Sequence, residues 1–152
     1  MDLILWRHAE AVEHGVVADL DRPLTPKGER QAARMSDWLN QRLAQTTRIL
    51  VSPALRCQQT AKALGRPFKT VEAIAPGADP QELLTAAKWP AAHEPVLVVG
   101  HQPTLGLTAA LLLAELPQPW SVKKGAVWWL RNRDREGLAQ VVLQVVMAPD
   151  CL

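Results

Sequence analysis

The chain has 152 residues, a length that fits one folded domain, and we expect a single domain over residues 1–152. Hydrophobic residues make up 48% and charged residues 21%, so a sizeable core can form without disulfide bonds. The formal net charge is +2 and no long basic run occurs, which argues against a nucleic-acid-binding protein.

The cysteines and the apolar segments indicate the compartment. Cys57 and Cys151 are far apart and match no metal-binding or redox spacing, which fits a reducing environment. The first residues lack the basic and long apolar regions of a signal peptide. The longest apolar run in the C-terminal half, around Ala109 to Ala114, is too short to cross a membrane. We therefore expect a soluble cytoplasmic protein that binds no membrane.

Short apolar runs alternate with helical patterns along most of the chain. Strands are expected over residues 3–6, 48–51, 68–71 and 96–99. Helices are expected over residues 28–43, 52–64, 81–87 and 104–113. Ser52 and Pro53 have the residue types of an N-cap and a first helical position.

The last part of the chain has a different pattern. Two strand-like runs, 126–130 and 138–147, flank a polar segment over 132–137 and predict a hairpin at a sheet edge. The whole order predicts an α/β fold with a mostly parallel sheet covered by helices on both faces. The hairpin must add at least one antiparallel strand.

Cationic and imidazole side chains follow three of the expected strands. Arg7 and His8 follow the first strand, Arg56 lies about one turn into the helix after the second, and His101 follows the fourth. In parallel α/β sheets, binding sites lie beyond the carboxyl ends of the strands. We therefore expect these four side chains to converge at one edge of the sheet.

These residue types suit phosphoryl transfer. A neutral imidazole is a nucleophile near pH 7, and a guanidinium binds phosphate oxygens with a planar fork of donors. A second histidine can donate a hydrogen bond to a phosphate oxygen. Because arginines and histidines supply the positive charge, we expect no metal and no other cofactor.

Four sequence blocks occur in an order that resembles a known family. The blocks are LWRHAEA (5–11), RPLTPKG (22–28), VSPALRCQQTA (51–61) and VVGHQP (98–103). They resemble the histidine phosphatase superfamily, also called phosphoglycerate-mutase-like, and more closely its SixA-type phosphohistidine phosphatases. The resemblance implies a three-layer α/β/α sandwich with a six-stranded sheet, one strand of which is antiparallel.

The same resemblance assigns roles to individual residues. It implies that His8 is the nucleophile that carries the phosphoryl group. It implies that Arg7, Arg56 and His101 form the phosphate pocket. Arg22 matches a further arginine that lines the pocket in the SixA-like group.

Two departures from the family pattern affect the expected activity. Ala9 replaces the usual glycine after the histidine, which would strain any positive φ at that position. Many members also use a carboxylate acid between the third and fourth strands, where this chain offers Glu72, Asp79 and Glu82 with no clear match. A phosphoramidate leaves as an easily protonated imidazole, so the lack of an acid favours a phosphohistidine substrate.

We therefore expect a phosphohistidine phosphatase that acts on a protein, such as a phosphorelay domain or a phosphocarrier, through a phosphohistidine on His8. Two alternatives stay open: a phosphomonoesterase for a small phosphate ester, and a non-catalytic phosphate-binding module. The sequence indicates neither the physiological substrate nor the oligomeric state, and it assigns no role to Glu10. His14 and His93 are expected on the surface, and Lys123 and Lys124 are expected as a solvated pair, with a place near the rim of the pocket as the alternative.

Overall fold

A single mixed sheet organises the computed structural model, which describes residues 1–135 and 137–152. The described strands are β1 (Asp2–Arg7), β2 (Arg48–Val51), β3 (Lys69–Thr70), β4 (Val96–Gly100), β5 (Val127–Arg135) and β6 (Leu138–Met147). The α-helices are α1 (Pro26–Asn40), α2 (Leu55–Lys62), α3 (Pro80–Ala86) and α4 (Thr104–Ala114). Short 3-10 turns are η1 (Asp19–Asp21), η2 (Glu72–Ile74) and η3 (Pro149–Cys151).

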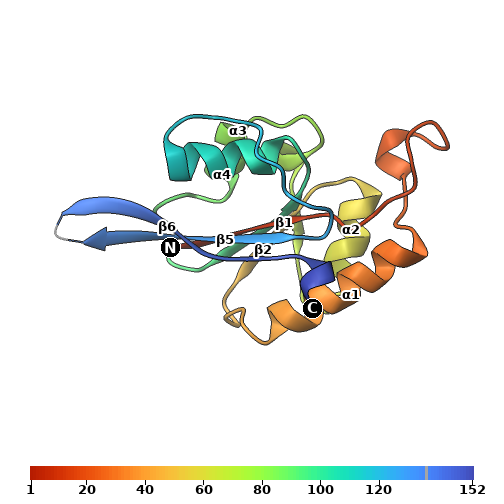
Figure 1. Cartoon of the computed structure of the whole chain (residues 1–152), viewed down its shortest axis with the longest axis horizontal. Helices are drawn as coiled ribbons and strands as arrows, with labels where there is room; N and C mark the ends of the chain where they lie inside the picture. The colour runs from red at the N-terminus through yellow and green to blue at the C-terminus, as the bar shows by residue number, and fades with distance from the viewer. Residues whose placement is uncertain (136) are drawn as a thin grey trace.

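The order of strands across the sheet is β3-β2-β4-β1-β5-β6. The first four of these run parallel, β5 runs antiparallel to β1, and β6 runs antiparallel to β5. Helices α3 and α4 cover one face of the sheet, and α1 and α2 cover the other (Figure 1). The expected α/β/α sandwich with a six-stranded mixed sheet is therefore confirmed.

The central strands are buried on both faces, which explains why they read as continuous apolar runs. Along β1, Leu3 and Leu5 belong to the core cluster under α3 and α4. Ile4 and Trp6 belong to the cluster under α1 and α2. All four side chains are fully buried, so the strand that leads into the site is held from both sides.

The start of α2 differs from the prediction. The N-cap is Ala54 and the helix begins at Leu55, whereas the sequence suggested Ser52 as the cap. Ser52 Oγ accepts a hydrogen bond from the Ala54 amide at 3.3 Å, and it also contacts His101. The Ser-Pro signal therefore marks a turn that precedes the helix rather than the helix terminus.

The C-terminal hairpin is longer than predicted. The first strand was expected to end at residue 130, but β5 continues to Arg135 because its polar residues still pair with β6. Glu136, within the expected turn over 132–137, lies outside the described residues. Trp128 and Trp129 pack against different core clusters, and both are partly buried, since each lies against the margin of its cluster.

Candidate active site

The carboxyl ends of β1, β2 and β4 lie at one level, as the sequence predicts. Arg7 at the end of β1 is in register with Gly100 at the end of β4. The His8 amide donates to the Gly100 carbonyl at 3.2 Å, and the Ser52 amide donates to the Val99 carbonyl at 3.1 Å. The segments that follow the three strands therefore start side by side.

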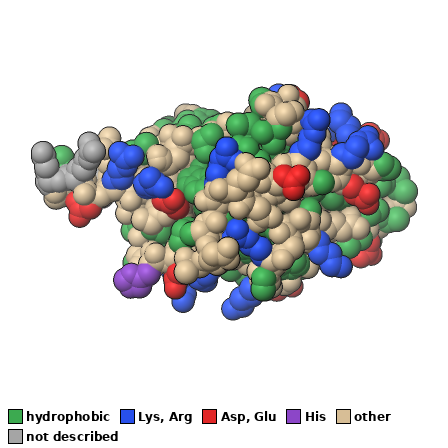
Figure 2. Space-filling model, turned by 90° about the horizontal axis from the view of Figure 1, so that it is seen from below, with side chains coloured by type: hydrophobic (Ala, Val, Ile, Leu, Met, Phe, Trp, Pro, Cys, Tyr) green, Lys and Arg blue, Asp and Glu red, His purple; other side chains and the backbone are tan. Residues whose placement is uncertain are grey.

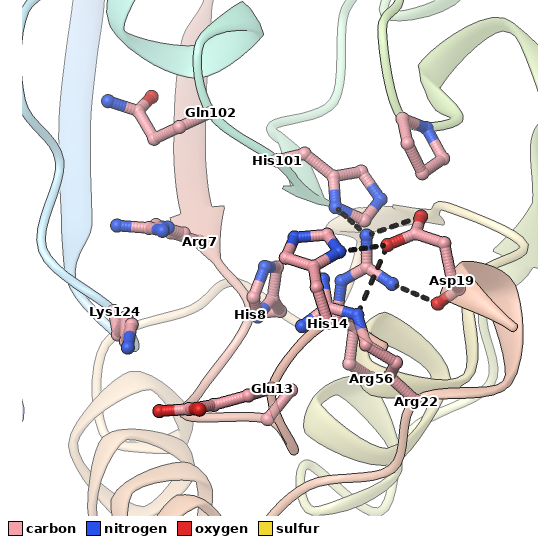
Figure 3. Close-up of a pocket in the computed structure, with 12 residues that line it drawn as sticks. Arg7, His8, Glu13, His14, Asp19, Arg22, Arg56, His101, Gln102 and Lys124 are labelled. Atoms are coloured by element: carbon pink, nitrogen blue, oxygen red, sulfur yellow. Dashed lines mark hydrogen bonds and ion pairs between the residues drawn. The ribbon is translucent and has the colours of Figure 1, made fainter. Parts of the chain in front are cut away.

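A pocket of about 560 Å³ opens at this edge, and it brings the predicted site residues together (Figure 3). Its lining includes all five of them, namely Arg7, His8, Arg22, Arg56 and His101. Four are buried polar groups, since the exposed fraction is 7% for His8, 8% for Arg22, 3% for Arg56 and 4% for His101. Buried cationic and imidazole groups around one hollow form a site that attracts an anion.

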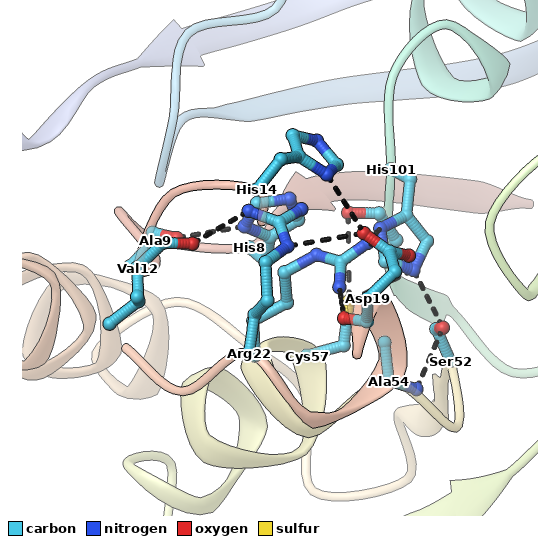
Figure 4. Close-up of polar contacts among 12 residues, drawn as sticks. His8, Ala9, Val12, His14, Asp19, Arg22, Ser52, Ala54, Cys57 and His101 are labelled. Atoms are coloured by element: carbon cyan, nitrogen blue, oxygen red, sulfur yellow. Dashed lines mark hydrogen bonds and ion pairs between the residues drawn. The ribbon is translucent and has the colours of Figure 1, made fainter. Parts of the chain in front are cut away.

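His8 is held in one tautomer. Its Nδ1 lies 2.8 Å from the carbonyl oxygen of Ala9, which can only accept, so Nδ1 carries the proton and donates (Figure 4). In the neutral ring this leaves the lone pair on Nε2. Burial, together with the positive charges of Arg56 and Arg7, lowers the pKa of His8 to about 4. The side chain is therefore a neutral imidazole near pH 7, the form required of a nucleophile.

His101 is the second imidazole of the pocket, with its ring centroid 5.3 Å from that of His8. A guanidinium can only donate, so Nη2 of Arg56 donates to Nδ1 of His101 at 3.3 Å. Nε2 then carries the proton and donates to Ser52 Oγ at 2.7 Å. Burial and the neighbouring His8 lower the pKa of His101 to about 3, so this ring is also neutral.

Asp19 joins two of the pocket arginines. One carboxylate oxygen accepts from Nε of Arg22 at 3.1 Å, and the other accepts from Nη2 of Arg56 at 3.3 Å. The backbone carbonyl of Asp19 accepts a further bond from Nη1 of Arg56 at 2.7 Å. Burial opposes ionisation of Asp19, but Arg56 and Arg22 outweigh it and hold the pKa of this carboxyl below its ordinary value.

Two pocket arginines have a buried donor without a partner among the described residues. In the described part of the chain, Nε of Arg7 and Nε of Arg56 are buried without a hydrogen-bond partner. Leaving such a donor unsatisfied costs about 1–3 kcal/mol. Both side chains line the pocket, so the oxygens of a bound phosphate are suitable acceptors.

The segment after His8 is held by hydrogen bonds to α2, and its backbone conformation is unstrained. The Ala9 amide donates to Thr60 Oγ1 at 3.1 Å, and that hydroxyl donates to the carbonyl of Arg56 at 2.7 Å. Among the described residues, the non-glycine positions with positive φ are Lys88 and Glu115. Ala9 has no positive φ and therefore replaces the family's glycine without strain, so the replacement is tolerable as expected.

Glu10 acquires a structural role that the sequence did not assign. Its carboxylate accepts a hydrogen bond from Thr25 Oγ1 at 2.8 Å, and Thr25 Oγ1 accepts from the Gly28 amide as the N-cap of α1. A Cβ at Gly28 would overlap the carbonyl oxygen of Glu10, so only glycine allows this approach. Glu10 thus links the segment that follows His8, called the nucleophile loop (residues 8–12), to the start of α1.

Several pocket residues were not identified from the sequence. Asp19, Glu13 and Gln102 line the pocket although the sequence assigned no role to them; Asp19 and Glu13 lie in a polar loop, whereas Gln102 follows His101 after β4. His14 is exposed as expected, yet it lines the pocket and lies 3.4 Å from Asp19. Lys124 also lines it, which agrees with the alternative that the lysine pair lies near the rim of the pocket. Most of these lie in loops, where hydrophobic periodicity gives no guide to position.

The candidate acids do not reach the site. Glu72 lies in η2, Asp79 caps α3 by accepting from the Gln81 amide, and Glu82 lies in the first turn of α3. None of the three lines the pocket, whereas Pro76 from the same region does. The carboxylates that do line it are Glu13 and Asp19.

No group of three or more His, Cys, Asp or Glu side chains with a metal-binding arrangement is found within residues 1–135 and 137–152. In the same described residues, no helix has the length and hydropathy of a membrane-spanning segment.

Comparison with known proteins agrees with the geometry of the pocket. The model of the histidine phosphatase superfamily (branch 1) matches residues 3–77. The phosphohistidine phosphatase SixA of Escherichia coli is 31% identical over 127 residues, which cover 77% of this chain and 78% of SixA. This chain belongs to the histidine phosphatase superfamily.

Within the superfamily the chain is similar to the SixA group. A solved structure of the protein histidine phosphatase SixA complexed with tungstate has a TM-score of 0.77 and 26% identity, covering 99% of both chains. An uncharacterised protein of Picosynechococcus sp. is 36% identical over 141 residues, covering 87% of this chain and 86% of that protein.

Proposed function

We propose that this chain is a metal-independent phosphohistidine phosphatase that removes the phosphoryl group from a histidine of a protein. The observation that carries the proposal is His8, which is buried, neutral and fixed in the tautomer that leaves Nε2 free, at the centre of an arginine-lined pocket. The similarity to SixA supports the same substrate class.

In the first proposed step, Nε2 of His8 attacks phosphorus in line with the leaving nitrogen. A bond forms between His8 and phosphorus while the phosphorus–nitrogen bond of the substrate breaks. The leaving imidazole keeps the electron pair and takes its proton from water. The enzyme then carries the phosphoryl group as phosphohistidine.

In the second proposed step, water attacks phosphorus and the bond to Nε2 of His8 breaks. The proton of the attacking water passes to a phosphate oxygen, so inorganic phosphate leaves and His8 is again neutral. Donation from Nδ1 to the Ala9 carbonyl holds the ring in place through both steps.

The cations around His8 stabilise the charge on the three equatorial oxygens. The side chains of Arg7, Arg22 and Arg56 all line the pocket, so three guanidinium groups are available for this role. A phosphate dianion beside His101 would raise the pKa of that ring, which lets Nδ1 donate to an oxygen once the substrate is bound. The tungstate bound by a SixA structure is an oxyanion of similar shape and supports an oxyanion site here.

The nature of the acid separates this function from ester hydrolysis. Asp19 is ionised by its arginine partners and therefore has no proton to give to a leaving alkoxide. Imidazole can be protonated by water, whereas general acid catalysis of an alcohol leaving group is worth about 10²–10⁴-fold. Because Asp19 cannot serve as the acid, the pocket favours a phosphoramidate over an ester.

The alternative of a small-ester phosphatase rests on one residue, Glu13. Its carboxylate lines the pocket and is exposed, so it is the remaining candidate for an acid. In that case Glu13→Gln would abolish turnover of a sugar phosphate. Our proposal predicts little change in phosphohistidine hydrolysis by the same variant.

The deciding experiment compares hydrolysis of a phosphohistidine peptide with hydrolysis of glucose 6-phosphate, with and without EDTA. We expect a preference of about 100-fold or more for the peptide and no effect of the chelator. Equal or greater rates on glucose 6-phosphate would contradict the substrate class. A protein that binds tungstate but hydrolyses neither compound would be a binding module.

A further inference from the structure

A groove of cationic side chains continues from the catalytic pocket along α1. A hollow beside the pocket is lined by Lys27, Lys123 and Lys124, and Lys124 also lines the pocket itself. The next hollow, of about 410 Å³, is lined by Lys27, Arg30 and Arg34. The basic groove is defined here by Lys27, Arg30, Arg34, Lys123 and Lys124.

The spacing of the residues on α1 gives the groove its length. Lys27, Arg30 and Arg34 stand three and four residues apart, so they share one face of the helix. At 1.5 Å per residue, Lys27 and Arg34 are about 10 Å apart along the helix axis. The face that carries α1 shows Lys and Arg side chains gathered at its upper right (Figure 2).

The groove keeps a strong positive charge. Asp150 is the one acidic residue that lines the two hollows in the described part of the chain. It forms an ion pair with Lys123 at 3.1 Å, and this partner lowers the pKa of the carboxyl, so it neutralises one of five cations. The five basic side chains are all exposed; Lys123 is paired with Asp150, and Nη1 of Arg34 donates to the Leu152 oxygen at 3.3 Å.

The groove starts on a definite side of the nucleophile. Arg7 and Lys124 lie on one side of His8 (Figure 3). Asp19 and Arg56 lie on the other side, where they are bound to each other. A substrate whose phosphoryl group reaches His8 can therefore extend past Lys124 toward α1. Arg30 and Arg34 do not line the pocket, so a small phosphate compound can bind there without contacting them.

We propose that the basic groove binds an acidic surface of the phosphorylated substrate protein next to its phosphohistidine. The inference rests on the proposed function, because it requires a protein substrate. Opposite charges of this kind steer the encounter and fix the orientation in which the phosphohistidine enters the pocket. The contacts are exposed, so they act through the association rate and weaken with salt.

The test uses two synthetic peptides of equal length that each carry one phosphohistidine. One has Asp and Glu around the phosphohistidine, and the other has Ser and Gln. The test variant is Lys27→Gln/Arg30→Gln/Arg34→Gln, which removes three charges that do not line the catalytic pocket. The matched control is Lys62→Gln/Lys69→Gln/Lys88→Gln, which removes three exposed charges elsewhere.

We expect the test variant to lose about tenfold in kcat/KM on the acidic peptide at low salt and to match the wild type on the neutral peptide. The control variant should match the wild type on both. Raising the NaCl concentration from about 50 to about 500 mM should remove the advantage of the acidic peptide for the wild type. A reversed variant, Lys27→Glu/Arg30→Glu/Arg34→Glu, should instead prefer a peptide with Lys around the phosphohistidine.

Failure of this inference can be told apart from failure of the proposed function. If the wild type hydrolyses neither peptide nor free phosphohistidine, the proposed function is wrong. If it hydrolyses both peptides but the test variant behaves as the wild type, the docking proposal alone is overturned. If the test variant loses binding to a single-stranded oligonucleotide and keeps its rate on the acidic peptide, the groove serves nucleic acid and the proposal is also overturned.

Discussion

The carboxylate of Asp19 lies 3.3 Å from Nη2 of Arg56, and the backbone carbonyl of the same residue accepts a second bond from Nη1. An internal anion thus binds the arginine that the proposed mechanism assigns to the phosphoryl group. A substrate oxyanion at this place meets the repulsion of Asp19 as well as the attraction of the arginines.

Removal of this carboxylate charge should therefore strengthen oxyanion binding. We expect Asp19→Asn to bind tungstate about three- to tenfold more tightly than the wild type, measured by calorimetry. Asp21→Asn is the matched control, because Asp21 lies in the same η1 turn but does not line the pocket. Weaker tungstate binding by Asp19→Asn would show that Asp19 instead positions the arginines for the anion.

The hydrogen bond from His101 to Ser52 predicts a positioning role for the serine. Ser52→Ala removes the acceptor that holds the His101 ring at 2.7 Å. We expect kcat to fall about tenfold because the serine orients a pocket group, and Tm to fall as well because buried donors lose their acceptor. Ser52→Thr should restore much of the rate, and a rate unaffected by either change would rule out this role.

The pH dependence of the rate should reflect the low pKa of His8. The nucleophile must be neutral, so activity is lost as the pH falls through the folded pKa, which is about 4. The acid limb of kcat/KM should therefore lie well below the ordinary value of 6.5. An acid limb near 6.5 in a stable protein would mean that the His8 ring is not desolvated.

The same shifts predict how stability depends on pH. His8 and His101 have folded pKa values of about 4 and about 3, both below the ordinary value of 6.5. Between about pH 6.5 and these values the unfolded chain binds more protons than the folded chain, so the free energy of unfolding falls as the pH falls. Urea titrations across this range should show a smaller loss of stability for His8→Asn/His101→Asn.

The close approach of Gly28 to Glu10 predicts a cost in stability. Gly28→Ala would place a Cβ on the Glu10 carbonyl oxygen and push α1 away from the nucleophile loop. We expect a loss of about 1–3 kcal/mol in the free energy of unfolding, measured by urea denaturation. Lys27→Ala, on an exposed neighbouring position of α1, should change it by less than about 0.5 kcal/mol.

The sequence predicted the parts of the site that adjoin buried strands. Arg7, His8 and His101 follow continuous apolar runs whose ends are set by the parallel sheet, so their convergence could be inferred. Asp19 lies in a polar loop and reaches the pocket through ion pairs, which leave no periodic signal. Ser52 was misread because a Ser-Pro pair suits a helix cap as well as a turn.

The most direct test of the proposed mechanism is to trap the enzyme while it carries the phosphoryl group. Wild-type protein mixed with a phosphohistidine peptide labelled on phosphorus, and quenched in alkali, should carry label on His8, identified by mass spectrometry. His8→Asn should carry none and should not hydrolyse the peptide. Label on a different residue, or full hydrolysis by His8→Asn, would contradict the assignment of His8 as the nucleophile.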